Sequence, residues 1–113
     1  MEIKTRDILL CSFYFSNFQQ TKNRPVLILK DNLPFDDFIA IPISSKIEKL
    51  NNDEFIISSD DFSLGNIPQK SKLILRKTFV VSKKNVIKKY GCLTNNKFKE
   101  IKKKFCLYFD CSN

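Results

Sequence analysis

The chain has 113 residues, of which 42% are hydrophobic, and a formal net charge of +8. This size suits one domain with one core, here assigned to residues 1–113, and the apolar content argues against disorder. No apolar stretch approaches the roughly 20 residues of a transmembrane helix, and residues 1–7 are too charged to begin a signal peptide. We therefore expect a cytoplasmic protein with no membrane partner.

The first predicted strand covers residues 7–15. Its apolar residues alternate, which places one set of them on a single face. These are Leu9, Cys11, Phe13 and Phe15. Residues 16–23 then form a polar loop that ends directly on Arg24. Two interpretations of this loop stay open, a binding loop over a site or a plain hairpin connection.

Two further strands are predicted over residues 26–29 and 38–41, which are rich in branched side chains and separated by a cluster of Asp, Asn and Pro. Arg24 precedes the first strand and Ser44 follows the second. Pro42 interrupts the second strand, which requires a sheet edge or a bulge there. A bulge would turn the serines that follow toward the arginine. The alternative is that these serines merely end the strand.

The second half of the chain predicts more strands, over residues 54–58, 70–75 and 78–81. Between the first two of them, Asp60 and Asp61 lie in a turn-rich segment, far in sequence from any catalytic partner. We interpret these two carboxylates as turn and cap residues.

Two helices are predicted near the C-terminus. Ser82 caps a short helix over residues 83–90, which Gly91 ends in a left-handed conformation. Thr94 caps a second helix over residues 95–109, whose apolar residues fall within an arc of about 100°, the width of a packing face. They are Phe98, Ile101, Phe105, Tyr108 and Phe109. The fold class is therefore mainly β, a small barrel with short helices that is closed by the C-terminal helix.

The positive charge is unevenly distributed. Residues 1–68 carry 7 basic and 10 acidic side chains, whereas residues 69–113 carry 13 basic and 2 acidic ones. Clustered Lys and Arg raise the local concentration of phosphates, which indicates nucleic acid or an acidic protein as a partner. For any single lysine, a solvated surface position is the commoner explanation.

Several chemistries are excluded by residue content. The chain has no histidine and only two glycines, which excludes histidine acid–base catalysis and a glycine-rich phosphate loop. Its four cysteines, Cys11, Cys92, Cys106 and Cys111, show no CxxC spacing, so we expect reduced thiols, no metal site and no cofactor. The last two are five residues apart, about 140° on a helix, and cannot clasp one metal from one face.

The remaining residue types suit a phosphodiester. Arg24 can present a planar fork of donors and stabilise charge on the nonbridging oxygens, while the Ser44 hydroxyl can hydrogen-bond the same phosphate or a ribose 2′-OH. Because RNA carries its own nucleophile in that 2′-OH, aligning it allows cleavage without metal, to a 2′,3′-cyclic phosphate and a free 5′-OH. Serine is a poor base and arginine a poor acid, so turnover should be slow to moderate. Taken alone, each residue is more often structural.

Five segments carry a family resemblance, namely 6–8, 23–29, 41–46, 73–82 and 89–93. In order and spacing they resemble the MazF/PemK toxins of type II toxin–antitoxin systems, specifically the PemK-like branch. The resemblance implies an SH3-like barrel with a C-terminal helix, a homodimer, and a metal-independent endoribonuclease that cleaves single-stranded RNA such as mRNA and inhibits growth. It also implies neutralisation by a small acidic antitoxin, and a catalytic pair that falls on Arg24 and Ser44.

The chain departs from the family pattern at three places. Arg6 stands where the family usually has glycine, Ser44 replaces the usual threonine, and the loop at 16–23 lacks glycine. Serine keeps the hydroxyl, but the changed loop means that no RNA sequence preference can be carried over.

Further candidate RNA contacts come from the neighbourhood of this pair and from the basic second half. They are Ser45, Lys46, Lys22, Arg76 and Lys77. Two other functions stay open, a noncatalytic nucleic-acid-binding barrel and a toxin of the same fold that poisons a protein target such as gyrase.

Overall fold

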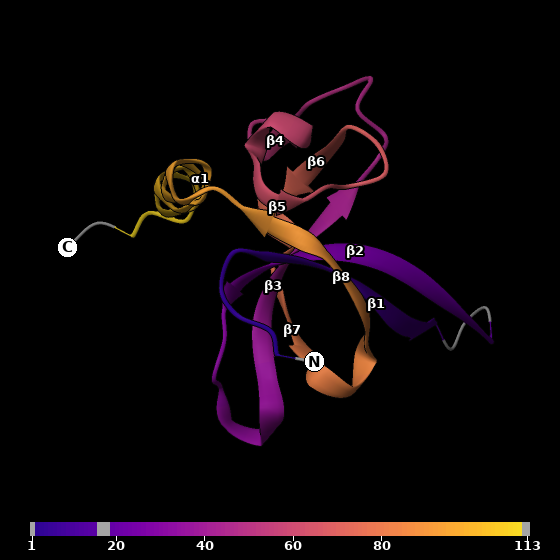
Figure 1. Cartoon of the computed structure of the whole chain (residues 1–113). Helices are drawn as coiled ribbons and strands as arrows, with labels where there is room; N and C mark the ends of the chain where they lie inside the picture. The colour runs from indigo at the N-terminus through magenta and orange to yellow at the C-terminus, as the bar shows by residue number, and fades with distance from the viewer. Residues whose placement is uncertain (1, 16–18, 112–113) are drawn as a thin grey trace.

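The computed structural model describes residues 2–15 and 19–111, which contain eight strands and one α-helix. The strands are β1 (Asp7–Phe15), β2 (Gln20–Lys30), β3 (Asp37–Ser44), β4 (Glu54–Ile57), β5 (Phe62–Gly65), β6 (Ser71–Ile74), β7 (Phe79–Ser82) and β8 (Val86–Leu93). The helix α1 (Asn95–Tyr108) lies to one side of the strands (Figure 1). Within the described ranges, no helix combines the length and apolar character needed to cross a bilayer.

The strands form one antiparallel sheet in the order β4-β6-β3-β2-β1-β8-β5, with β7 also paired to β3. The two ends of this path, β4 and β5, are separated in the chain only by residues 58–61, so the sheet must bend back on itself. In that connection Asp61 accepts a hydrogen bond of 2.9 Å from the Ser58 N–H, which confirms the predicted cap. The fold is a mainly β, curled half-barrel with one C-terminal helix, and the predicted fold class is confirmed.

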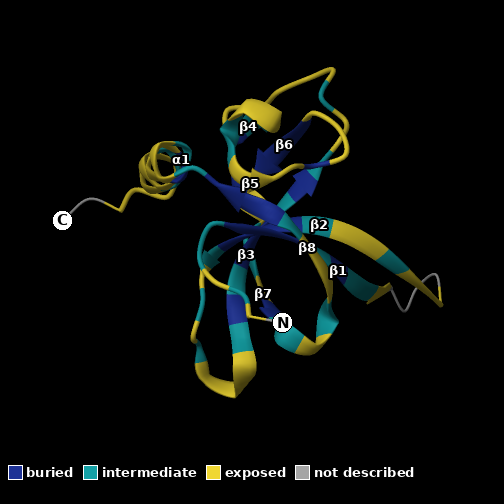
Figure 2. Ribbon diagram, viewed as in Figure 1, coloured by how far each residue is buried: buried dark blue, intermediate teal, exposed yellow. Residues whose placement is uncertain are grey.

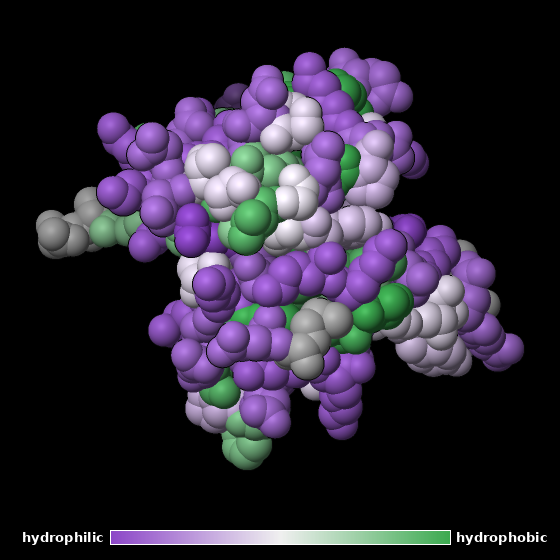
Figure 3. Space-filling view, viewed as in Figure 1, coloured by the Kyte–Doolittle hydropathy of each residue, from purple (hydrophilic) through white to green (hydrophobic). Residues whose placement is uncertain are grey.

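The sheet buries both of its faces. Leu27 packs in one hydrophobic cluster with Phe98 and Ile101 of α1, whereas its neighbours Val26 and Ile28 pack in a second cluster. Because successive side chains of a strand point to opposite faces, burial on both sides accounts for the unbroken apolar runs. The buried residues lie mainly in the central strands (Figure 2), and the outer face in view is largely hydrophilic (Figure 3).

The strand β1 has its predicted bounds, but β2 begins at Gln20, well before the predicted residue 26. The predicted loop over 16–23 is therefore wrong for its second half, while residues 16–18 lie outside the described residues. The polar residues 20–23 form a strand because their backbone pairs with that of β1. This ladder continues outward past the pair Phe13 and Lys22. This ribbon projects from the sheet (Figure 1), so its polar residues stay in water while the backbone pairs.

The predicted helix over residues 83–90 is wrong. Ser82 does act as a cap, since its hydroxyl accepts a hydrogen bond of 3.4 Å from the Lys84 N–H, but it caps only one 3-10 turn. The chain then continues as β8, which pairs with both β1 and β5. The β-branched residues Val86 and Ile87 favour this strand over a helix.

Gly91 lies within β8 rather than at a helix end. A Cβ atom on Gly91 would collide with the carbonyl oxygen of Leu64, and one on Gly65 would collide with that of Tyr90. Gly65 also has a φ of +71°, in the left-handed region that favours glycine. The two glycines of the chain therefore allow β5 and β8 to approach closely.

The C-terminal helix is confirmed, with Thr94 as its cap, whose hydroxyl accepts a hydrogen bond of 3.1 Å from a backbone N–H of the first turn. The predicted packing face divides into two parts. Phe98 and Ile101 are buried against the sheet, whereas Tyr108 and Phe109 are 43% and 44% exposed. The helix therefore packs on the barrel through its first turns, and its last turn extends beyond the core.

Arg6, which replaces the usual family glycine, has a φ of 81° and so adopts a left-handed conformation. Its N–H donates to the Ile28 carbonyl (3.1 Å) and its carbonyl accepts from the Leu93 N–H (3.0 Å). Its guanidinium also donates to the Leu93 carbonyl at 3.0 Å. These three hydrogen bonds hold Arg6 in the left-handed conformation, which costs a residue with a side chain roughly 1–2 kcal/mol.

Candidate functional site

Arg24 and Ser44 lie at the same end of the β2–β3 ladder. The pair Val26 and Pro42 is the last of the β2–β3 ladder at this end, and Arg24 and Ser44 lie two residues beyond it on their own strands. Both residues line the same two cavities. The structure thus brings together the two residues that the sequence predicts as a pair.

Pro42 marks a change of partner along β3. Residues 37–40 pair with β7, whereas Ile43 and Ser44 pair with β6. Pro42 falls between these two ladders, where its missing N–H removes no ladder hydrogen bond on that side. The predicted local edge is confirmed on this side of β3, and Ser44 lies at the C-terminal end of the strand, where it pairs with β6.

Two cavities meet at Arg24 and Ser44, and both residues line both cavities. We call the first, of about 480 Å³, the Tyr90 cavity. Its other polar side chains include Asn23, Ser45, Lys46, Gln69 and Tyr90. We call the second, of about 550 Å³, the Phe79 cavity. It is lined further by Phe13, Tyr14, Val26, Lys77 and Phe79, among others. Among the described residues, no carboxylate lines either cavity.

The Arg24 guanidinium is exposed, and its hydrogen bond is to a backbone carbonyl, that of Asn23, at 3.2 Å. Within the described parts of the chain no carboxylate lies in ion-pair contact with it. Its positive charge is therefore available to an anion that enters either cavity.

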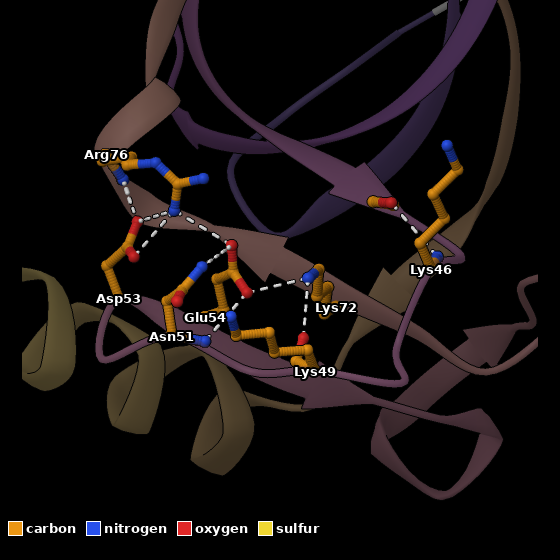
Figure 4. A network of polar contacts seen from close by, with 8 residues as sticks. Lys46, Lys49, Asn51, Asp53, Glu54, Lys72 and Arg76 are labelled. Carbon is orange, nitrogen blue, oxygen red and sulfur yellow. Dashed lines mark hydrogen bonds and ion pairs between the residues drawn. The ribbon is translucent and has the colours of Figure 1, made fainter.

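The Ser44 hydroxyl is positioned by its own strand end. Its Oγ accepts a hydrogen bond of 3.1 Å from the Lys46 backbone N–H, drawn in Figure 4. Because an accepted bond occupies a lone pair, the hydroxyl hydrogen remains available to donate. The side chain is half-buried, so this donor has a defined position at the rim of the cavities.

An ionic cluster with buried carboxylates lies close to this site along β6 (Figure 4). Glu54 contacts the Lys72 ammonium at 2.7 Å and the Arg76 guanidinium at 2.9 Å. Arg76 also contacts Asp53 at 2.8 Å. We call these four residues the Glu54 cluster. The contact with Lys72, then the Asn51 backbone N–H and Arg76, hold the pKa of Glu54 well below its usual range.

The Glu54 cluster anchors the segment that follows Ser44. Lys72 lies opposite Ser44 in the β3–β6 ladder, and its ammonium also donates to the Lys49 carbonyl at 3.0 Å. Asn51 donates to Glu54 through both its backbone (3.0 Å) and its side chain (3.2 Å). The cluster therefore fixes the loop after residue 46 and, through β6, the strand end that carries the hydroxyl.

The other predicted RNA contacts divide by position. Ser45 and Lys46 line the Tyr90 cavity, and Lys77 lines the Phe79 cavity. Lys22 lies two residues before Arg24 on β2 and lines neither cavity. Arg76 also lines neither, and Glu54 raises its pKa within the cluster. Contact with RNA remains a prediction for all five.

Sequence reasoning did not identify several residues of the cavity walls. Tyr90 and Gln69 line the Tyr90 cavity, and Tyr90 was placed on a helix that does not exist. In the Phe79 cavity, Phe13 and Phe79 have ring centroids 5.5 Å apart, although they are far apart in the sequence. The alternating apolar residues of β1 predict which face of the strand carries Phe13. No local pattern, however, predicts that Phe13 contacts Phe79.

The described residues contain no group of three or more His, Cys, Asp or Glu side chains placed to hold a metal ion. The charge facing the two cavities comes instead from arginine and lysine. The fold and site thus define a class, small curled β half-barrels with a cationic cleft that suits phosphate esters.

A family model described as the PemK-like, MazF-like toxin of type II toxin–antitoxin systems matches residues 4–109. The chain belongs to this toxin family. No curated protein sequence matches the chain.

Solved structures show the same fold. An endoribonuclease in complex with its cognate antitoxin, from a mycobacterial species, matches with a TM-score of 0.76 and 11% identity, over 99% of each chain. The Mycobacterium tuberculosis toxin MazF-mt6 matches with a TM-score of 0.65 and 17% identity, over 90% of this chain and 96% of that chain. At these identities the likeness supports the fold.

Proposed function

We propose that this MazF-like toxin is a metal-independent endoribonuclease that cleaves single-stranded RNA. The observation that carries the proposal is that Arg24 and Ser44 line two adjoining cavities in which, among the described residues, no carboxylate is present. A phosphodiester at their junction meets a guanidinium and a hydroxyl donor at once. Membership of the toxin family supports this assignment.

In the proposed reaction the RNA supplies the nucleophile. The 2′-OH oxygen attacks the adjacent phosphorus, the bond to the 5′ oxygen of the next nucleotide breaks, and the products are a 2′,3′-cyclic phosphate and a 5′-OH. Arg24 offers two parallel N–H donors to the nonbridging oxygens, on which negative charge increases in the transition state. These donors therefore stabilise the transition state more than they stabilise the bound substrate. That difference is the condition for catalysis.

Ser44 holds the same group from the other strand. Since its Oγ already accepts the Lys46 N–H, its hydrogen can point to a phosphate oxygen or to the 2′-OH. Neither serine nor arginine is a base at neutral pH, and the chain has no histidine. The proton of the 2′-OH therefore passes to solvent, and the departing 5′ oxygen takes a proton from solvent. Because neither proposed catalytic residue assists these proton transfers, turnover should be slow to moderate.

The two cavities suit the bases on either side of the scissile phosphate. The Phe79 cavity offers aromatic faces, including Tyr14, which is 65% exposed, and stacking on such faces contributes about 1–3 kcal/mol per base. The Tyr90 cavity offers the amides of Asn23 and Gln69, which can hydrogen-bond the edges of an unpaired base. These contacts favour a single strand, because only an unpaired base exposes its faces and its pairing edge to side chains.

We also propose that the toxin acts as a homodimer and is neutralised by a small acidic antitoxin. The excess of basic side chains over residues 69–113 complements an acidic segment. The structural neighbour that was solved with its cognate antitoxin supports such a partner.

The direct test is to incubate the purified protein with a long RNA in EDTA and to map the new 5′ ends. We expect cuts at discrete short sequences, with products that carry a 5′-OH. The matched variants are Arg24→Ala and Arg76→Ala, because both remove an arginine but only Arg24 lines the cavities.

The alternatives give different results in the same experiment. Binding of RNA without any cut, retained in Arg24→Ala, would indicate a noncatalytic nucleic-acid-binding barrel. Intact RNA together with a stalled topoisomerase reaction would indicate a toxin that acts on a protein such as gyrase.

A further inference from the structure

The helix α1 ends in a turn that reverses the chain. Asp110 adopts a left-handed conformation with a φ of 56°, and the Cys111 N–H donates to the Cys106 carbonyl at 2.9 Å. This bond, which spans five residues and follows a left-handed residue, defines a Schellman motif. In that motif the residue after the left-handed position commonly contacts the side chain of the residue whose carbonyl it binds.

Both of these positions are cysteines here. Cys106 neighbours Cys111 and raises the pKa of its thiol, and both residues line one surface hollow. The separation of about 140° that an ideal helix predicts does not apply here, because α1 ends at Tyr108, before Cys111. Two neighbouring cysteines at one helix end are a site that the toxin reaction does not use.

The other two cysteines have different surroundings. Cys11 is completely buried, and burial raises the pKa of its thiol to about 11. Cys92 is buried next to the Ser63 hydroxyl, with Sγ and Oγ 3.1 Å apart. Cys106 and Cys111 are exposed, so a reagent in solution reaches them first.

A surface hollow lies beside the pair and is lined by Lys102, Lys103, Leu107 and Asp110 together with the two thiols. Disulfide exchange needs a thiol that a disulfide in solution can reach, and both cysteines are exposed at this hollow. The hollow leaves room for the leaving thiol of a small-molecule disulfide. Access and a neighbouring second thiol therefore occur at one place.

We propose that Cys106 and Cys111 are a redox modification site that closes to an intramolecular disulfide in the presence of a small-molecule disulfide such as oxidised glutathione. One thiolate attacks a sulfur of the oxidant, forms a mixed disulfide and releases one thiol. The second cysteine then attacks the protein sulfur of the mixed disulfide and releases the other thiol. The two cysteines lose two electrons and two protons, and the oxidant becomes two thiol molecules.

The disulfide would fix the last turn of α1. This turn carries Leu107, which is 71% exposed, together with the rings of Tyr108 and Phe109, which meet edge to face with centroids 5.0 Å apart. Oxidation therefore acts on the exposed apolar end of the helix, away from Arg24 and Ser44. The proposal does not rest on the nuclease activity.

The test is mass spectrometry of the intact folded protein after incubation with oxidised glutathione. We expect a product that is lighter by two hydrogen atoms, and peptide mapping should find the bond between Cys106 and Cys111. In Cys111→Ser, which lacks the resolving thiol, one glutathione should remain attached to Cys106. Two stable glutathione adducts on the unaltered protein, or a bond that involves Cys11 or Cys92, would overturn the proposal.

A matched pair of variants tests the turn itself. Asp110→Gly accepts the left-handed conformation, whereas Asp110→Val disfavours it. We expect ring closure to slow by about tenfold in Asp110→Val relative to Asp110→Gly, the factor that corresponds to the cost of a left-handed residue with a side chain. Equal closure rates would show that the Schellman motif does not bring the thiols together, and would contradict the proposal.

Discussion

Two groups of positive charge flank Ser44, and they differ in what they face. In the Glu54 cluster, Lys72 and Arg76 each contact a carboxylate at 2.9 Å or less. At the junction of the two cavities, Arg24 faces no carboxylate among the described residues. The number of basic residues in a segment therefore does not identify which of them are free to meet an anion. We expect the absence of an acidic partner to be the better guide to RNA contacts.

The largest expected effect separates the two arginines. Arg24→Ala should lower the rate of RNA cleavage by about 100- to 1,000-fold, the usual loss on removing a donor that stabilises transition-state charge, and should leave the melting temperature nearly unchanged. Arg76→Ala should instead lower the melting temperature by several degrees, because it leaves the buried carboxylate of Asp53 without its cation and leaves Glu54 with Lys72 alone. Cleavage rates and thermal melts of both variants check this. A loss of cleavage in Arg76→Ala at full stability would break the comparison.

The next largest effect concerns the hydroxyl. Ser44→Ala should lower the cleavage rate by about 10- to 100-fold, since a hydrogen bond to a charged group contributes about 1.5–3 kcal/mol. Ser44→Thr keeps the hydroxyl and should retain most of the activity. Single-turnover rates at saturating RNA measure both variants. Equal rates for alanine and threonine would remove Ser44 from the catalytic pair.

The Glu54 cluster should also appear in the acid dependence of stability. Because the pKa of Glu54 is lower in the folded chain than its ordinary value of 4.5, its contribution is complete above that value and is lost as the pH falls toward the folded pKa. Thermal melts from pH 7 to pH 3 should therefore decline less steeply in Glu54→Gln than in the unaltered protein. Parallel curves would contradict the assignment.

The smallest effects are expected at the lysines of the cavity walls. Lys46→Ala and Lys77→Ala should each weaken RNA binding by a few fold at moderate salt and reduce the salt dependence of binding, as the loss of one phosphate contact does. Lys84→Ala, an exposed position that lines neither cavity, serves as the matched control. Equal salt slopes in all three variants would argue against these contacts.

Much of the fold could be predicted from the sequence because its signals are local. The alternation along β1, the Thr94 cap and the Asp61 turn each depend on a few neighbouring residues. The cap and the turn are confirmed, and the alternation is confirmed for Leu9, Cys11 and Phe13, while the Phe15 side chain lies outside what the structure describes. The helix predicted over 83–90 is wrong because Ser82 gives the same cap signal for one turn as for several. The strand conformation of residues 86–93 is determined by the pairing of β8 with β1 and β5, and no local sequence pattern reveals that pairing.

The candidate site divides in the same way. Arg24 and Ser44 could be found because each stands at the end of an apolar run, and the two strand ends border the same two cavities. The partners of Arg76 could not be found, since Asp53 and Glu54 lie more than 20 residues earlier and meet it only through the β4–β6 ladder. Tyr90 was missed for the same reason.

The proposal that the RNA 2′-OH is the nucleophile can be tested directly with two RNA oligonucleotides, each incubated with the toxin in EDTA. The first contains one mapped cleavage site. The second differs only in that the nucleotide 5′ of the cut is 2′-deoxy. We predict that the first is cut to a 2′,3′-cyclic phosphate and that the second is bound but not cut. Cleavage of the deoxy-substituted oligonucleotide, or a product with a 5′-phosphate, would contradict the account.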